Sequence, residues 1–271
     1  MAQYLPTQFS PPRIRSYLYR LPLFTRIMLL IIVACYIGSI FYPDVNNWAA
    51  LKPSLTNLQT LYRLNTFPLF HRGFFHALFN ILAIVPLLER FEAENGTLVS
   101  FILFSGPFST FPGGMYTLIE RFILRSDTAV LGSSVWVFLL LCAEAIKLWR
   151  SNPSFSLGPY PIPTWTTPLI LMLTITFLMP STSLLGHLCG AAIGYLWGLN
   201  YIKFLAPPER IIRWIEGKLN LLGRVPHYVS VDQKTYGRYG VLPSMSSNSR
   251  ENRAENGVAM GTWGQGQRLG P

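Results

Sequence analysis

Long apolar stretches separated by short polar segments fill the chain as far as residue 205. Crossing the roughly 30 Å hydrocarbon core of a bilayer takes about 20 helical residues at about 1.5 Å each. Stretches of that order run Leu23–Tyr42, Phe67–Leu88, Thr97–Phe111, Val130–Trp149, Trp165–Met179 and Ser183–Leu205. The pattern therefore predicts an all-α, polytopic membrane protein with a bundle of six transmembrane helices.

The third and fifth stretches are the shortest of the six. An apolar segment of this length is also compatible with a re-entrant helix that does not cross the bilayer. The third stretch has room to continue irregularly beyond Pro112-Gly113-Gly114. Both interpretations stay open at the level of sequence.

Composition supports a membrane protein over a soluble domain. Of the 271 residues, 50% are hydrophobic and only 13% are charged, and the mean hydropathy is +0.32. Cys35, Cys142 and Cys189 lie in separate apolar stretches, so no disulfide framework and no metal-ligand spacing is present. We therefore expect neither a metal ion nor a cofactor.

The net charge of +10 is better explained by membrane topology than by nucleic-acid binding. Ten of the 22 basic residues fall from Lys203 onward, and four more lie in the first 26 residues. Basic residues favour the cytosolic side, so both termini are predicted to be cytosolic, which requires an even number of spans. We expect a cytosolic segment at 1–22, a six-span membrane domain at 23–205, and a cytosolic, largely disordered tail at 206–271.

Polar side chains inside predicted spans are costly and therefore mark candidate functional sites. They are His76, Asn80, Ser134 and His187. Ser134 and His187 each come about four residues into a span that starts on the non-cytosolic side, so both are expected about 6 Å below its start. His76 and Asn80 are spaced i, i+4 and share one helix face.

Ser134 and His187 have the chemistry of a nucleophile and its general base. Gly132 precedes Ser134 by two positions at a loop-to-helix junction, where free backbone N–H groups can stabilise an oxyanion. Every aspartate of the chain lies in a predicted loop or in the tail, so a Ser-His dyad is expected, with Phe138 stacking on the imidazole. Ser133 competes as nucleophile, and only the Gly-x-Ser spacing favours Ser134.

The last predicted span carries a glycine at every fourth position: Gly186, Gly190, Gly194 and Gly198. This spacing makes a smooth ridge along one helix face and allows a neighbouring helix to approach closely. Because His187 adjoins the first glycine, packing of this face on the fourth span would bring it to Ser134. Glu89, Glu92 and Glu94 are interpreted as part of a solvated cytosolic loop.

These motifs resemble those of the rhomboid family of intramembrane serine proteases over roughly Leu23–Leu205. HALFN matches the family's His-x-x-x-Asn, GSSV matches Gly-x-Ser-x, and HLCGAAIG matches the histidine followed by a glycine ladder. The resemblance implies Ser134 as the nucleophile, His187 as the base, and His76, Asn80 and the Ser134 N–H as oxyanion donors. From their positions in the sequence, the supporting residues are expected to be Gly132, Phe138, Gly190 and Gly194.

Two further features fit the same resemblance. Tyr62-Arg63 occupies the place of the family's aromatic-Arg pair in the first loop, with tyrosine in place of the commoner tryptophan. His71 corresponds to a structural histidine of the family.

The stretch LYRLNTFPLFHRGFFHALFNILAIVPLLERFEAENGTL is similar to fungal rhomboid proteins of the early secretory pathway. This similarity implies Golgi or neighbouring membranes, and clients that are membrane-anchored proteins cleaved near the lumenal face. GQGQRLG at Gly264–Gly270 is similar to a tail motif that recruits the AAA-type segregase of ER-associated degradation. That motif expects an aromatic residue at the place of Thr262, whereas Trp263 comes one residue later.

Two other functions compete with proteolysis. A catalytically silent rhomboid-like protein that binds membrane clients in quality control or trafficking is one alternative, and such relatives usually lack the serine and the histidine that this chain has at 134 and 187. A channel or transporter would place paired charged residues in the middle of the spans. Few are present, so the sequence favours an intramembrane serine endopeptidase.

Overall fold

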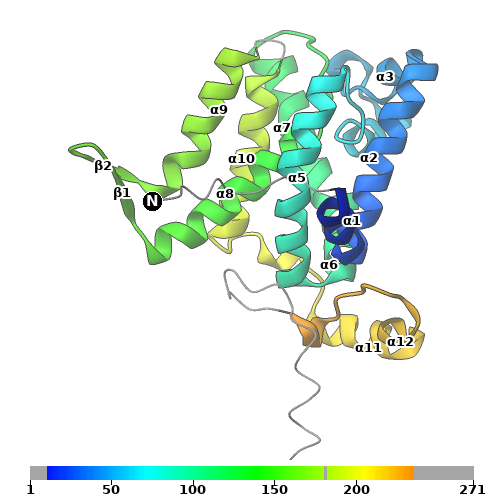
Figure 1. The fold of residues 1–271 in the computed structure, drawn as a ribbon. Coiled ribbons are helices and arrows are strands. Elements are labelled where there is room, and N and C mark those ends of the chain that lie inside the picture. Colours follow the sequence, from blue (N-terminus) through cyan, green and yellow to red (C-terminus); the bar gives the residue numbers. More distant parts are fainter. Residues whose placement is uncertain (1–10, 180–181, 235–271) are drawn as a thin grey trace, which may run out of the picture. The chain divides into compact units, whose positions relative to one another are not determined.

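The computed structural model describes residues 11–179 and 182–234, and most of these residues are helical (Figure 1). The helices are α1 (Pro11–Arg20), α2 (Leu23–Phe41), α3 (Asp44–Ala49), α4 (Arg63–Thr66), α5 (Phe74–Asn95), α6 (Thr97–Ser105), α7 (Pro107–Leu118), α8 (Ser134–Ser151), α9 (Thr167–Leu178), α10 (Leu184–Gly198), α11 (Glu209–Leu219) and α12 (Leu221–Arg224). A compact unit of the chain ends at Lys234.

Five of the six predicted spans overlap an apolar helix of the structure. Within the described ranges, three helices are long and apolar enough to cross a membrane: Leu23–Phe41, Phe74–Asn95 and the continuous segment Thr97–Ile123. Two more, Thr164–Leu178 and Leu184–Gly198, are apolar but shorter. Helix α8 has a suitable length, but it carries Glu144, Lys147 and Arg150 in its second half.

Two of the predicted helices begin later in the structure than expected. The second helix begins at Phe74 rather than Phe67, and the fourth at Ser134 rather than Val130. The residues before these helices bind other loops instead of their own helix: the Val130 N–H donates to the Leu51 carbonyl at 3.0 Å, and the Gly132 N–H donates to the Phe67 carbonyl at 2.9 Å. Hydropathy cannot separate such buried loop residues from a span.

The third span is longer than predicted. It bends at Gly106, restarts at Pro107 and ends in a π-helical turn at Ile119–Ile123. Pro112 lies inside this helix and does not terminate it. The irregular continuation considered above is therefore present.

A short β-hairpin interrupts the all-α pattern between α8 and α9. Strands β1 (Ser154–Leu157) and β2 (Tyr160–Pro163) pair antiparallel, and the turn between them contains Gly158 with a φ of +62°. A positive φ suits glycine because it has no Cβ. The sequence analysis missed this hairpin, since four-residue strands give a weak periodic signal.

Helix α8 lies at the centre of the bundle and packs on α10, α5 and α7. Most of its residues from Val135 to Ile146 are buried. Beside it, edge-to-face and tilted aromatic contacts join α5, α6, α7, α8 and α10 through Phe91, Phe104, Phe108, Trp136 and Trp197. This packing holds the first turn of α8 in a fixed place relative to the other helices.

The prediction that disorder begins at residue 206 does not agree with the structure. Helix α11 forms there, and the segment after α12 returns to the bundle. The Leu23 N–H donates to the His227 carbonyl at 2.9 Å, and the Thr97 N–H donates to the Val229 carbonyl at 2.9 Å. Buried Tyr228 and Val231 anchor the returning segment within the compact unit that ends at Lys234.

The acidic cluster of α5 is structural rather than solvated. Glu92 is fully buried, and its carboxylate accepts hydrogen bonds from the backbone N–H groups of Phe24 and Thr25 and from the hydroxyls of Thr25 and Thr97. An anionic carboxylate at the first turn of α2 also suits the helix dipole. Because three elements meet on one side chain, Glu92 fixes the start of α2 against the α5–α6 junction.

A second ionic group joins α5 to α8 near the same end. Arg90 Nε lies 3.0 Å from a carboxylate oxygen of Glu144, and Lys147 pairs with both Glu94 and Glu144. These pairs account for Glu144 and Lys147 in the second half of α8, since acid and base neutralise one another between two helices.

Candidate active site

Ser134 and His187 meet between α8 and α10. Ser134 is the first residue of α8 and His187 lies in the first turn of α10, and Ser134 Oγ is 3.0 Å from His187 Nε2. His187 is 2% exposed, whereas Ser134 is half-buried. The hydroxyl thus lies within hydrogen-bond distance of an imidazole and remains open on one side.

The imidazole of His187 is oriented by packing. The ring of Phe138, one turn after Ser134, lies 4.6 Å from it between centroids at an angle of 41°. Within the part of the chain that the structure describes, His187 Nδ1 is buried and has no hydrogen-bond partner. The site therefore contains a serine-histidine pair with an aromatic ring beside the imidazole.

The glycine ridge of α10 is what permits this approach. A Cβ on Gly190 would overlap the carbonyl oxygen of Val135, and one on Gly194 would overlap the carbonyl oxygen of Leu139. The backbones of α8 and α10 thus touch directly through their small residues. Larger residues at these two positions would separate the helices that carry Ser134 and His187.

Ser133 belongs to a different, fully enclosed pair. Its side chain is 0% exposed, and its Oγ lies 3.2 Å from Nε2 of His71, which is also 0% exposed. The Ser133 backbone N–H donates to the same Nε2 at 3.2 Å. Because that nitrogen accepts, the neutral ring of His71 carries its proton on Nδ1. The pair joins the loop before α5 to the loop before α8.

His76 and Asn80 lie at the beginning of α5, close to the residues that precede Ser134. A Cβ on Gly132 would come within 2.8 Å of His76 Nε2, and Gly132 has a φ of +121°. The position is therefore restricted to glycine by both conformation and space. Asn80 is buried, and its amide nitrogen donates to the His76 carbonyl at 2.8 Å. One amide hydrogen of Asn80 stays within its helix, and the other remains for a ligand.

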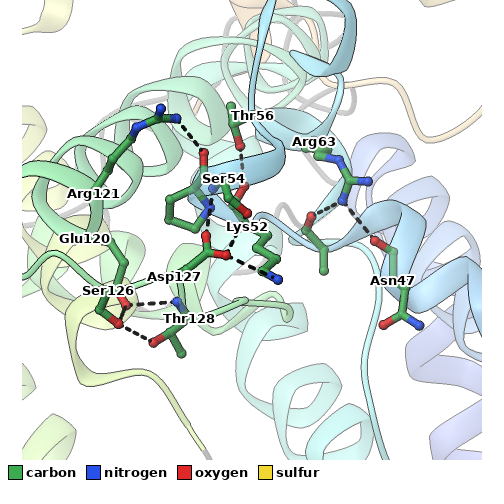
Figure 2. A network of polar contacts seen from close by, with 12 residues as sticks. Asn47, Lys52, Ser54, Thr56, Arg63, Glu120, Arg121, Ser126, Asp127 and Thr128 are labelled. Carbon is green, nitrogen blue, oxygen red and sulfur yellow. Dashed lines mark hydrogen bonds and ion pairs between the residues drawn. The ribbon is translucent and has the colours of Figure 1, made fainter.

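The loop that leads into the site is clamped by polar contacts (Figure 2). One carboxylate oxygen of Asp127 accepts from the Ser54 N–H at 2.7 Å, the other accepts from the Ser54 hydroxyl at 2.6 Å, and Lys52 forms an ion pair at 3.2 Å. A β-bridge between Leu51 and Val130 continues the contact toward Gly132. The first loop thus fixes the segment that ends at Ser134.

Glu120 secures the same loop from the other side. Its buried side chain accepts from the Ser126 hydroxyl at 2.8 Å and from the Thr128 N–H at 3.2 Å. Sequence reasoning did not find Asp127 or Glu120. Asp127 and Ser54 are 73 positions apart, so no local motif signals their contact.

The predicted aromatic-Arg pair organises the first loop. Arg63 is buried and donates to the carbonyls of Asn47 and Ala50 at 2.9 and 2.5 Å. Tyr62 stacks on Trp48 with centroids 4.7 Å apart. These contacts set the position of residues 47–50, which precede the strand-like residue Leu51 of the clamp.

A profile described as "Rhomboid domain" matches residues 58–204, the region that contains every one of these side chains from His71 to His187. The chain belongs to the rhomboid family. It is 57% identical over 267 residues to "Rhomboid-type serine protease B" of Aspergillus fumigatus, covering 98% of this chain and 97% of the relative. It is 54% identical over 279 residues to "Rhomboid-type serine protease 2" of Neurospora crassa, covering 100% of this chain and 99% of the relative.

A third relative, "Rhomboid-type serine protease 2" of Podospora anserina, is 50% identical over 287 residues, with 98% of both chains covered. At this identity, over nearly the whole length of each protein, the chain is a serine protease and hence a hydrolase. Rhomboid membership and the long apolar helices make it an integral membrane protein. Within residues 11–179 and 182–234, no group of three or more His, Cys, Asp or Glu could hold a metal ion.

Proposed function

We propose that this rhomboid is an intramembrane serine endopeptidase in which Ser134 is the nucleophile and His187 is the general base. The observation that carries the proposal is the 3.0 Å separation of Ser134 Oγ and His187 Nε2, with Oγ on a half-buried residue. A serine hydroxyl is a weak nucleophile at neutral pH and needs an adjacent base to take its proton. The ring of His187 lies within hydrogen-bond distance of this hydroxyl and can take the proton.

Acylation follows from this pairing. The Ser134 hydroxyl donates its hydrogen bond to Nε2 of neutral His187. As Oγ attacks the scissile carbonyl carbon, its proton passes to Nε2 and a tetrahedral oxyanion forms. Collapse of that intermediate breaks the C–N bond, and imidazolium gives its proton to the leaving amine. Phe138 keeps the ring in place throughout, in the role that an acidic residue has in a triad.

The oxyanion is stabilised at the start of α8. The first N–H groups of a helix have no intrahelical acceptor, so the Ser134 N–H is available there. His76 adjoins Gly132, and Asn80 lies one turn further along α5, so both side chains approach the same region as donors. Gly132, held by the clamp of Figure 2, presents the turn that aims these groups.

Deacylation requires water at the acyl-enzyme. Water donates a proton to His187 Nε2 and attacks the ester carbonyl. As the ester C–O bond breaks and releases the acid, the imidazolium returns that proton to Ser134 Oγ, which restores the hydroxyl and the neutral ring. Client helices must unwind before their carbonyls can be attacked, so membrane-anchored clients with Gly, Pro or small residues in the cleaved segment are expected.

The proposed topology has six spans, cytosolic termini and a catalytic site toward the lumenal end. The first turns of α5, α8 and α10 carry His76, Ser134 and His187, so these three helices begin near the site. The opposite end is where the segment 227–229 binds the first residues of α2 and α6. Arg150 in the last turn of α8 and Lys203 just after α10 lie at that opposite end, which supports a cytosolic assignment.

Active-site labelling in detergent tests the assignment directly. A fluorophosphonate probe should label the wild-type protein and the Ser133→Ala variant, and labelling should disappear in Ser134→Ala and fall sharply in His187→Ala. Persistent labelling of Ser134→Ala would overturn the assignment. Loss of labelling in Ser133→Ala, with an unchanged unfolding temperature, would move the nucleophile to Ser133.

We also propose residence in Golgi or neighbouring secretory membranes, and recruitment of an AAA-type segregase by GQGQRLG. Both rest on the sequence resemblance, and the motif lies outside the described residues. Deleting residues 262–271 should abolish segregase recovery in an affinity pull-down while fluorophosphonate labelling is retained. A matched variant that scrambles the same ten residues controls for length. Unchanged recovery after deletion removes the recruitment proposal.

A further inference from the structure

Helix α11 presents an apolar face that nothing in the described part of the chain covers. Ile211, Trp214 and Leu219 of α11 are 50%, 64% and 52% exposed, and Leu222 of α12 is 53% exposed. At about 100° per residue, Ile211 and Trp214 lie about 60° apart on one side of the helix, whereas Leu219, in the last turn, lies beside Ile212. The inner side is marked by Ile212 and Glu216, which are 1% and 8% exposed.

The acidic and basic side chains of this segment are engaged differently. Glu216 is buried and accepts from the Tyr228 hydroxyl at 2.8 Å, a contact that with burial raises the pKa of Tyr228. Glu209 pairs with Arg213 and Lys234. The carboxylates of Glu209 and Glu216 are thus paired with other side chains of the protein.

Arg210, Lys218 and Arg224, in contrast, are exposed, and within residues 11–179 and 182–234 none of them has a hydrogen-bonded or ion-paired acidic partner. Arg210 and Lys218 flank Trp214 on the helix surface, because they are spaced by four residues on either side of it. Long basic side chains beside an apolar face can direct their charges sideways while their stems lie along it. The outer face of α11 is therefore both apolar and cationic.

Helix α11 lies at one end of the helix bundle (Figure 1). The segment that follows α12 binds the first residue of α2 through His227 and the first residue of α6 through Val229. Figure 1 shows α11 and α12 at the end of the bundle where α1 and the start of α6 lie. Exposed Tyr19, Tyr201 and Phe204 flank membrane helices at this end. Such aromatic residues gather at membrane–water interfaces.

From these observations, we infer that α11 is an interfacial helix that lies on the surface of the same bilayer that the protein spans and binds its anionic lipid headgroups. Ile211 and Trp214 enter the headgroup–acyl boundary, and Arg210, Lys218 and Arg224 contact the acidic phosphates and carboxylates. The positive charge of this face is complementary to an anionic leaflet. This inference does not depend on the proposed catalytic roles.

Spin labelling of the full-length protein tests the inference. The starting variant has Cys35, Cys142 and Cys189 replaced by alanine and must retain a cooperative unfolding transition. A nitroxide is attached at Ile211→Cys or, as a matched control on the opposite side of the same helix, at Arg213→Cys. Each protein is reconstituted into phosphatidylcholine bilayers with and without phosphatidylserine. Accessibility to oxygen reports lipid contact, and accessibility to a water-soluble nickel chelate reports water contact.

With phosphatidylserine present, the label at 211 should be severalfold more accessible to oxygen than to the chelate, at a depth of about 5–10 Å. The label at 213 should remain accessible to the chelate in both bilayers. Chelate access at 211 equal to that at 213 overturns the inference. Shielding of 211 from both reagents also overturns it, because a protein partner or second copy would then cover the face.

The charge requirement is tested in the 211-labelled protein. Replacing Arg210, Lys218 and Arg224 together by glutamine should return the label in phosphatidylserine bilayers to the accessibility measured without that lipid. The control exchanges Arg210→Lys, Lys218→Arg and Arg224→Lys, which preserves the charges and should preserve the depth. Equal depth in the glutamine and control proteins would contradict binding to anionic headgroups.

Discussion

Two serine-histidine pairs form around adjacent residues of this rhomboid, and they differ in access rather than in chemistry. Ser133 and His71 are both fully buried, with Oγ and Nε2 3.2 Å apart. Ser134 and His187 have the same two atoms 3.0 Å apart, but Ser134 is half-buried. A client can reach only a hydroxyl that is open to it. The comparison teaches that proximity to a base makes a serine a candidate, and exposure separates a nucleophile from a structural tie.

The pairs also differ in what they join. Ser133 and His71 connect two loops that are already held together by the Gly132–Phe67 hydrogen bond. Ser134 and His187 connect two helices, and their distance depends on the whole α8–α10 contact. The enclosed pair should therefore affect local stability, whereas the open pair should affect activity and respond to changes in helix packing.

The largest expected effect is on activity. Ser134→Ala should lower cleavage of a reconstituted transmembrane client by at least about 10³-fold, because the covalent intermediate cannot form. The thermal unfolding midpoint should change little, since the lost hydroxyl is half-exposed. Ser133→Ala should keep measurable cleavage. If the two alanine variants lose activity equally while both stay folded, the contrast between the pairs is wrong.

The next effect comes from the helix contact. Gly194→Ala places a Cβ against the Leu139 carbonyl oxygen, so α8 and α10 must separate. We expect a cost of about 1–3 kcal/mol in stability from overpacking, together with a marked loss of cleavage. Chemical unfolding in mixed micelles and a cleavage assay measure the two quantities.

Gly114→Ala is the matched control for that variant. Gly114 also lies in a helix, α7, but a Cβ there would meet nothing within 4 Å. Removing a helical glycine at an open position should leave stability unchanged or raise it by up to about 1 kcal/mol. Equal destabilisation by both substitutions would show that the glycine ridge has no special role in joining the open pair.

A smaller effect is expected from the enclosed pair. Ser133→Ala removes the hydroxyl that contacts His71 and leaves that buried ring with one hydrogen-bond donor fewer, for a loss of about 1–2 kcal/mol in stability. Ser134→Ala, measured in the same unfolding experiment, should lose less than half of this. A reversed order of the two stabilities would contradict the assignment of Ser133 to a structural role.

The smallest effect should come from the clamp that leads to both pairs. The Ser54 hydroxyl and N–H, with Lys52, hold the pKa of Asp127 below its ordinary value of 3.8. A carboxyl with a lowered folded-state pKa stabilises the fold above its unfolded pKa, and the contribution is lost as pH falls through the folded-state value. Asp127→Asn should therefore lower the unfolding midpoint slightly at pH 7, and the difference from wild type should vanish as the pH falls below the folded-state pKa of Asp127.

The cleavage rate of Asp127→Asn should fall only modestly, because Glu120 still holds the loop through Ser126 and Thr128. Lys52→Gln provides the comparison on the other side of the ion pair and should change the midpoint less, since Ser54 continues to hold the carboxylate. A midpoint difference between Asp127→Asn and wild type that stays the same when the carboxyl of wild type is protonated at acidic pH would exclude the carboxylate as its cause.

The sequence by itself determined much of this protein. Hydropathy located the helices, because a bilayer imposes a length and an apolar composition that are visible along the chain. The motifs around His76, Ser134 and His187 are local in sequence and identify their candidates without a structure. The glycine ridge of α10 is equally visible, since its four-residue spacing follows directly from helix geometry.

Tertiary structure decided what depends on contacts between distant residues. It separated Ser133 from Ser134 by burial, paired Glu144 with Arg90, and enclosed Glu92 at the start of α2, where sequence indicated a solvated loop. It also moved the beginning of the second and fourth helices and folded residues 206–234 back onto the bundle. Each of these outcomes depends on which groups remain exposed after packing. The type of a single residue does not indicate which distant residue will pack against it or bind it.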